Sequence, residues 1–224
     1  KIKKTGDWRL YIKTITLVTT ALMMYSLLMF APLQNWQALL ICVVFGISLA
    51  SIGFSVMHDA NHGSYSTKPK LNDFLGLSLN ALGASSYLWK QKHNIIHHTY
   101  TNVDGIDDDI NNMPFMRECS TQPWKPIHRY QQFYMFFLYG FTSLFLLFIT
   151  DYIKYVTRKV YTTPLKPMDM GEHLTFWISK TLYVAITIVI PILVLGWQPW
   201  LLGFLVMHFV LGLTLAVVFQ LAHV

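Results

Sequence analysis

Two clusters of histidines are the residues of this 224-residue chain whose type and spacing are best suited to chemistry. His58 and His62 are four positions apart, as are His93 and His97, and His98 follows directly. Side chains four positions apart share one helix face, whereas adjacent ones point about 100° apart. Imidazole nitrogens suit iron, copper or zinc. The spacing therefore predicts a transition-metal site, and the two directions of the second cluster suit two ions better than one.

A sixth candidate ligand, His223, lies near the end of the chain, three positions after Gln220. Taken alone, it is more readily explained as an ordinary residue at a helix end. Carboxylates lie close to the second cluster, and metal-bound histidines commonly donate their other ring N–H to such a group. We expect some of these carboxylates to orient the rings, and a solvated acidic loop is the alternative. The candidates are Asp59, Asp104, Asp107, Asp108 and Asp109.

Cysteine usage narrows the choice of metal. Cys42 lies in an apolar run and Cys119 in a polar loop, far along the chain from the histidine clusters. Structural zinc sites usually include thiolates, and none is expected near these clusters. A histidine-rich site at the end of a bundle in lipid, with carboxylates nearby, suits iron that activates oxygen.

The other histidines call for simpler explanations. His208 precedes His223 by a stretch that would extend about 22 Å on a helix, so it cannot share the same site. We expect it to make a hydrogen bond between helices. His128 and His173 lie in polar or basic segments, and we expect them on the surface.

Composition identifies the elements that must position the clusters. The chain is 54% hydrophobic and 12% charged, whereas soluble domains carry about 25% charged residues. Runs of roughly 20 apolar residues can cross a bilayer. The net charge of +6 is explained by lysines and arginines in the cytoplasmic loops of a membrane protein. Nucleic-acid binding is not expected. The apolar runs cover about 14–31, 36–57, 134–150, 174–196 and 200–219.

The positions of lysine and arginine predict the topology. Basic residues near the N-terminus place it in the cytoplasm, and basic residues also flank the 134–150 run on both sides. We therefore expect that run to dip into the interface without crossing, which places His223 on the same side as the clusters. Residues 71–89 are predicted to form an interfacial or buried helix. The predicted fold is an all-α membrane protein with four transmembrane helices in two hairpins, interfacial helices and a cytoplasmic histidine-rich cap.

At these residues the chain resembles the membrane fatty-acid desaturase family. HDANH at 58–62 and HNIIHH at 93–98 resemble its first two histidine boxes. The stretch WKQKHNIIHHTYTNVDGIDDDI looks like the bacterial acyl-CoA, or linoleoyl-CoA-like, branch, and FQLAHV resembles the segment that supplies an extra histidine ligand. The resemblance implies that Gln220 holds a metal-bound water and that six histidines bind iron: His58, His62, His93, His97, His98 and His223.

The resemblance also implies a reaction. Two iron ions would use dioxygen and two electrons to insert a cis double bond into a fatty acyl chain, carried as acyl-CoA or acyl-lipid. Electrons would come from a separate cytochrome b5, or from a ferredoxin with its reductase. An integral, multi-pass location follows, with the bacterial inner membrane favoured and the endoplasmic reticulum expected for a eukaryotic protein.

One departure from the family pattern is large. The third histidine box is absent from residues 1–224, which we expect to be a single membrane domain that is incomplete at its C-terminus. The natural protein is predicted to continue, and the chain alone is predicted to lack a complete metal site. The activity is therefore expected of the longer protein.

Two alternatives stay open. A related membrane diiron hydroxylase would keep the fold and change the product, because substrate placement decides between the two outcomes. A membrane metal transporter or sensor would place its ligands near the bilayer midplane, whereas these clusters fall at helix ends. The double-bond position is not predicted. An acyl tunnel and simple core packing explain equally well a group of small and aromatic residues: Gly76, Gly83, Tyr87 and Trp89.

Overall fold

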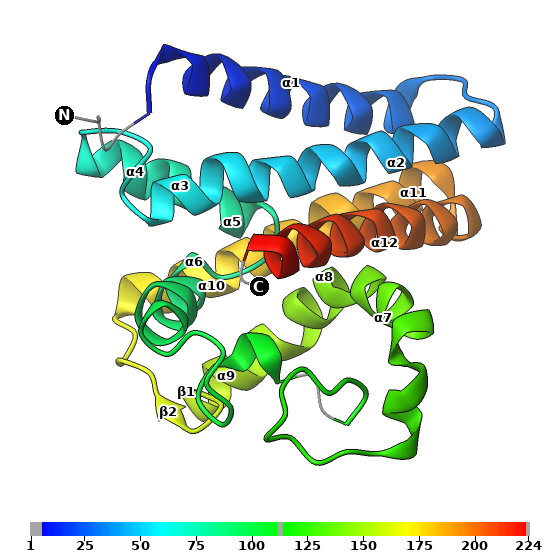
Figure 1. Ribbon diagram of the computed structural model, residues 1–224. Coiled ribbons are helices and arrows are strands. Elements are labelled where there is room, and N and C mark those ends of the chain that lie inside the picture. Colours follow the sequence, from blue (N-terminus) through cyan, green and yellow to red (C-terminus); the bar gives the residue numbers. More distant parts are fainter. Residues whose placement is uncertain (1–5, 112–113, 223–224) are drawn as a thin grey trace.

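The computed structural model describes residues 6–111 and 114–222, which form a helical bundle (Figure 1). His223 lies outside the described residues, so its predicted place beside the other histidines stays a prediction. Within the described part, the only strands are β1 (Lys159–Val160) and β2 (Thr163–Pro164), a short antiparallel pair. The expectation of an all-α chain is confirmed.

The first helical hairpin carries the first histidine pair at its end. It consists of α1 (Trp8–Phe30) and α2 (Asn35–Ile52). Helix α2 continues through a π-helical segment, η1 (Gly53–His58), into α3 (Asp59–Asn61). Helices α2, η1 and α3 together form one continuous apolar helix of 27 residues. At about 1.5 Å per residue this helix exceeds the roughly 30 Å of a hydrocarbon core, so the histidines fall at its end.

The second hairpin completes the set of long helices. Its first arm is α10 (Met170–Val184), η6 (Ala185–Val189) and α11 (Ile190–Leu195), and its second arm is α12 (Trp197–Ala222). With the first hairpin, the described residues contain four helices long and apolar enough to cross a membrane. This confirms the two predicted hairpins of a membrane protein.

The apolar run between the hairpins is bent. It follows the short turn η4 (Pro126–Tyr130) and comprises α7 (Gln131–Gly140) on one side and α8 (Thr142–Phe145), η5 (Leu146–Thr150) and α9 (Asp151–Thr157) on the other. The two halves are bent by 57°. A helix as short as α7 reaches about 15 Å, half of a hydrocarbon core of about 30 Å. The bend therefore suits a segment that dips and returns, and the predicted topology stays a prediction.

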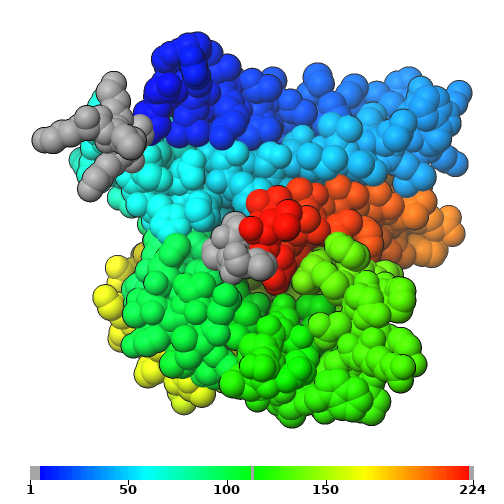
Figure 2. Space-filling view, in the orientation of Figure 1, coloured from blue at the N-terminus to red at the C-terminus, as the bar shows by residue number. Residues whose placement is uncertain are grey.

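A close backbone contact lies where the run bends. A Cβ on Gly212 of α12 would lie 2.6 Å from the Gly140 carbonyl oxygen and 2.9 Å from that of Tyr139. A side chain on Gly140 would in turn collide with the Phe209 ring. Helix α12 therefore fits against the end of α7 only because both positions are glycine. It packs against α2 on its other side, and Figure 2 shows its red end between the blue and cyan hairpin and the green segment.

The predicted single helix over residues 71–89 is wrong. The structure has three short helices there: α4 (Pro69–Gly76), α5 (Ser78–Ala81) and α6 (Ser86–Lys90), which continues into η2 (Gln91–His97). Gly83 interrupts the run with φ of +91°, a left-handed conformation that favours glycine. A Cβ at this position would lie 2.6 Å from the Tyr183 ring. The break between α5 and α6 thus coincides with a contact with α10 that the local sequence does not reveal.

The interhelical role predicted for His208 is confirmed. Its ring is fully buried, with Nδ1 3.0 Å from the Ser143 hydroxyl and Nε2 2.8 Å from the Tyr183 hydroxyl. Ser143 also donates to the His208 carbonyl, so its oxygen accepts from Nδ1–H and the Tyr183 hydroxyl donates to Nε2. Three helices are thereby joined.

The surface position predicted for His128 is wrong. Its side chain is buried, its Nδ1 accepts from Lys125 N at 3.0 Å, and its Nε2 donates to the Pro114 carbonyl at 3.0 Å. The ring closes the turn before α7. His173 is half-buried and lies 2.8 Å from the Tyr155 hydroxyl.

Candidate metal centre

The end of the first hairpin presents His58 and His62 on one helix face. The His62 amide donates to the His58 carbonyl at 3.0 Å, so the helix is regular between them. Their ring centroids lie 4.5 Å apart. The four-residue spacing therefore places both rings on one face of the helix, as the helix period predicts.

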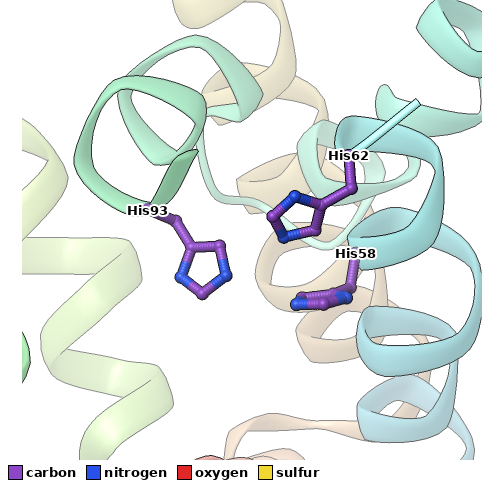
Figure 3. A group of neighbouring side chains, drawn as sticks. All are labelled: His58, His62 and His93. Atoms are coloured by element: carbon purple, nitrogen blue, oxygen red, sulfur yellow. The ribbon is translucent and has the colours of Figure 1, made fainter. Parts of the chain in front are cut away.

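His93 reaches the same point from the η2 helix. Its ring centroid lies 5.2 Å from that of His58 and 5.2 Å from that of His62. One potential ligand atom from each of the three rings lies within 4.8 Å of the others. Figure 3 shows the rings turned toward one another from the two helices. Two segments that are separate in sequence thus form one potential binding site.

The remaining histidines of the second cluster extend this group in two directions. The His97 ring is stacked on His93 at 5.2 Å between centroids, whereas His98 lies 5.0 Å from His62 and 4.7 Å from His93. His93 and His97 are 3% and 1% exposed. The structure therefore brings together all five predicted ligands that lie within its described residues.

Two carboxylates orient the His97 ring. Oxygens of Asp107 and Asp109 lie 2.9 and 3.0 Å from its Nδ1. Because carboxylates accept hydrogen bonds, Nδ1 carries the proton and Nε2 presents a lone pair. Asp107 is itself 1% exposed, and one of its oxygens accepts from Asn102 N at 2.8 Å. This is the arrangement expected around a metal-binding imidazole.

The other predicted carboxylates have different contacts. Asp108 accepts from Lys154 Nζ at 2.6 Å and lies 3.8 Å from Lys92 Nζ, so its partners are lysines. Asp59 lies 3.5 Å from His58 Nδ1. Asp104 accepts from the Thr121 hydroxyl at 2.7 Å, away from the rings. The acidic run is therefore not uniform.

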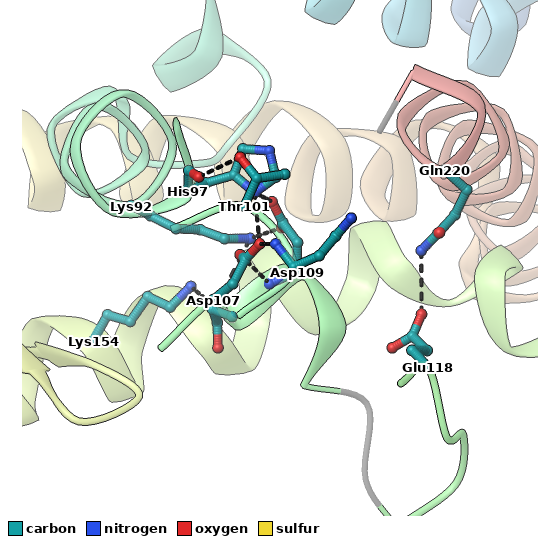
Figure 4. A network of polar contacts seen from close by, with 10 residues as sticks. Lys92, His97, Thr101, Asp107, Asp109, Glu118, Lys154 and Gln220 are labelled. Carbon is teal, nitrogen blue, oxygen red and sulfur yellow. Dashed lines mark hydrogen bonds and ion pairs between the residues drawn. The ribbon is translucent and has the colours of Figure 1, made fainter. Parts of the chain in front are cut away.

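The charge around the second cluster is balanced by lysines. Lys92 forms a close ion pair with Asp109, and Figure 4 shows Lys92 and Lys154 beside the His97 carboxylates. Although burial opposes it, Lys92 holds the pKa of Asp109 below its usual value, with help from His97. The hydrogen bond to Asp109 is the main cause that raises the pKa of His97. A carboxylate that stays ionised continues to accept the hydrogen bond from the Nδ1–H group of His97.

Burial favours the neutral form of the His62 and His93 rings. It lowers the pKa of His62 to about 4, and the neighbouring His58 and His98 rings lower it further. Burial and the same neighbours also lower the pKa of His93. Neutral imidazole is the form that binds a metal. His62 Nε2 is buried and has no hydrogen-bond partner among the described residues, and such a nitrogen fits a metal ion.

Several residues around the cluster were not expected from the sequence in these positions. Trp89 stacks on His93 with centroids 4.3 Å apart, and Phe219 lies 6.2 Å from the same ring. Gln220, predicted to hold a metal-bound water, donates to Glu118 at 3.2 Å (Figure 4). The position of Lys92 beside a histidine cluster and ahead of an acidic run is a usable signal. Glu118 and Phe219 offered none.

Comparison with known proteins places the chain. The family described as fatty acid desaturase matches residues 34–224. The sn-1 linoleoyl-lipid 6-desaturase of Arthrospira platensis is 33% identical over 96% of this chain and 59% of its own length. That of Synechocystis is 34% identical over 96% of this chain and 60% of its own length.

A third relative and the search of solved structures complete the comparison. The acyl-lipid (8-3)-desaturase of Physcomitrium patens is 35% identical over 80% of this chain and 38% of its own length. No solved structure matches the chain significantly. The chain spans about three fifths of the length of the two bacterial relatives, at 59% and 60%. With a family match over most of its residues and the histidine pairs in place, the chain belongs to the fatty acid desaturase family.

Proposed function

We propose that the protein containing this chain is an oxygen-dependent acyl-lipid desaturase, which inserts a cis double bond into a fatty acyl chain. The observation that carries this proposal is the convergence of histidines from residues 58–62 and 93–98 at one end of a membrane-spanning bundle. The names of the relatives support an acyl-lipid substrate over acyl-CoA.

The five described histidines have the chemistry of ligands for a pair of iron ions, and His223 is proposed as a sixth ligand. When bound, iron would supply the activation of dioxygen that removes two hydrogens from the acyl chain. Imidazole nitrogens in their neutral form suit this role. The proposed domain of residues 1–224 would be completed by ligands from the rest of the longer protein, as the third histidine box would provide.

The chain's own residues have distinct tasks in this proposal. Asp107 and Asp109 hold the Nδ1 proton of His97 and fix the direction of its Nε2. Asp59 is placed to do the same, more weakly, for His58 at 3.5 Å. Trp89 and Phe219 flank the His93 ring.

The proposed orientation puts the histidines on the cytoplasmic side, where soluble electron donors operate. Lysines and arginines before α7 and after α9 support this orientation. The proposed donor is a ferredoxin or cytochrome b5 with its reductase. The location is proposed to be the bacterial inner membrane, which the two bacterial relatives favour, with the endoplasmic reticulum as the eukaryotic counterpart.

A reconstituted assay tests the proposed function. The whole protein, loaded with iron in lipid nanodiscs, is supplied with ferredoxin, its reductase, reductant and oxygen. We expect an alkene with one additional double bond in lipid-bound acyl chains, detected by gas chromatography and mass spectrometry, and loss of product in His93→Ala. His173→Ala, away from the cluster, is the matched control.

Other products would change the proposal. A hydroxylated acyl chain without alkene would make the protein a hydroxylase. Conversion of acyl-CoA but not of lipid-bound chains would correct the substrate class. Zinc bound tightly with no oxygen consumption would instead favour a metal-binding protein without catalysis.

A further inference from the structure

Helix α9 carries two buried charged residues that the proposed chemistry does not use. Asp151 and Lys154 are 3% and 7% exposed and lie one helical turn apart. Burying a charge in apolar surroundings is costly unless it is paired and hydrogen-bonded. Their partners therefore indicate what the helix does.

Asp151 is bonded to the start of the helix that carries the second histidine cluster. Its Oδ2 accepts from Ser85 N at 2.9 Å and from Lys180 Nζ at 2.8 Å. Ser85 is the N-cap of α6, and its hydroxyl accepts from Leu88 N at 3.4 Å. Because α6 runs directly into η2, this contact fixes the first turn of the continuous helix α6–η2, which carries His93 and His97.

Lys180 strengthens the same junction from α10. Its ammonium group donates to the carbonyls of Gly83 at 2.7 Å and Leu147 at 2.8 Å as well as to Asp151. All three of its protons thus have acceptors, as a buried lysine requires. The segment before α6 is held between two elements, α9 and α10, that contribute no residue to the histidine clusters.

Lys154 is bonded to the acidic run that contacts His97 at the end of η2. Its Nζ donates to Asp108 at 2.6 Å. Asp108 lies between Asp107 and Asp109, the two carboxylates that contact His97 Nδ1. Figure 4 shows Lys154 extending from α9 toward this acidic run. One turn of α9 therefore contacts both the start of the histidine helix and the loop that orients its last ring.

We propose that α9, through Asp151, Lys154 and Lys180, is the element that positions the second histidine cluster for metal binding. The bent run between the hairpins thereby has a task beyond filling the bundle. This inference rests on the proposed function only in taking the histidines as metal ligands. Among the described residues, the three touch no predicted ligand, so they are positioning residues and not catalytic ones.

Metal binding by variants of the whole protein tests this inference. Lys154→Met and Asp151→Asn are titrated with cobalt(II), whose visible absorption reports ligand geometry, and iron is counted after loading. Loss of groups that orient metal ligands weakens metal binding by about 10- to 100-fold, and we expect at least the lower value together with an altered cobalt spectrum. Lys154→Arg, which keeps the charge, is expected to recover most of the binding.

Two control variants separate positioning from general stability. Ser143→Ala breaks the buried contact with His208, which has no part in the proposed metal site, and is expected to lower the unfolding temperature without changing cobalt binding. Lys159→Met removes an exposed charge next to α9 and is expected to change neither.

The outcomes are distinct. Wild-type cobalt affinity and spectrum in both Lys154→Met and Asp151→Asn would overturn the inference, as would an equal loss of binding in Ser143→Ala. A wild-type protein that binds cobalt and iron but forms no alkene would overturn the proposed function alone. A wild-type protein that binds neither metal would overturn both.

Discussion

Among the single residues, His97 has the most completely determined surroundings. Its Nδ1 faces two carboxylates, and one of these, Asp107, is as deeply buried as the ring itself. A buried carboxylate that accepts from a ring N–H and a backbone N–H has little freedom to move. The direction of the His97 lone pair is thus set before any metal arrives.

Replacing Asp107 tests this preorganisation. Asp107→Ala leaves the Nδ1 proton with Asp109 alone, and we expect metal affinity to fall by about 10- to 100-fold. Isothermal titration with cobalt(II) measures the change. Asp104→Ala, in the same loop but bonded to Thr121, is the matched control and should bind as the wild type does. Equal affinity in Asp107→Ala and the wild type would contradict the orienting role.

At this scale the sequence was informative for the histidines and poor for their supports. Imidazole is rare enough that two pairs four positions apart predict a metal site without any tertiary information, and the structure brings these rings together. Lys154 acts through a contact with a residue distant in sequence, and Trp89 stacks on a ring one helical turn away, but both residue types are common in ordinary cores and surfaces. Only folding shows what they touch.

At the scale of elements, hydropathy predicted the long helices because each must bury its own backbone bonds in lipid. It could not predict the three short helices between Pro69 and Lys90. Gly83 ends one of them where its backbone lies flat on the Tyr183 ring. The only local sign of this break in the sequence is the glycine itself. Because glycines also occur within helices, the break could not be predicted from it.

A comparison of two glycines tests this explanation. Gly83 and Gly196 both have positive φ, +91° and +84°, but only Gly83 is packed against a neighbour. Alanine at either position adds backbone strain, and at Gly83 the added methyl must also displace the ring, at a further cost of about 1–3 kcal/mol. We expect Gly83→Ala to lower the midpoint of thermal unfolding more than Gly196→Ala does. Equal midpoints would show that the ring contact is unimportant.

For the whole molecule, the predicted topology depends on the side of the membrane on which each loop lies. The described residues contain four helices long and apolar enough to cross the membrane, and a fifth crossing is added only if the bent run spans it. Charge predicts the same side for both ends of that run. The contacts of α9 with the histidine helix agree with a segment that returns to the face where the clusters lie.

Labelling of single cysteines checks this topology. In a chain with Cys42 and Cys119 replaced, cysteines at the exposed positions Lys125 and Lys159 bracket the bent run. A membrane-impermeant maleimide added to intact cells is expected to label neither, and both after permeabilisation. A cysteine at the exposed Gln198, in the opposite turn, is expected to react in intact cells. Reaction of Lys125→Cys and Lys159→Cys from opposite sides would make the run a fifth crossing.

The two histidine clusters sit on separate parts of the bundle, one at the tip of the first hairpin and the other on a helix held by α9 and α10. A metal ion shared by them would act as a cross-link across that seam. Metal at a thousand times its dissociation constant would add about 4 kcal/mol to the stability of the folded state. The supply of iron would then govern how long the protein survives in the membrane as well as how fast it works, and a cell short of iron would lose the protein itself.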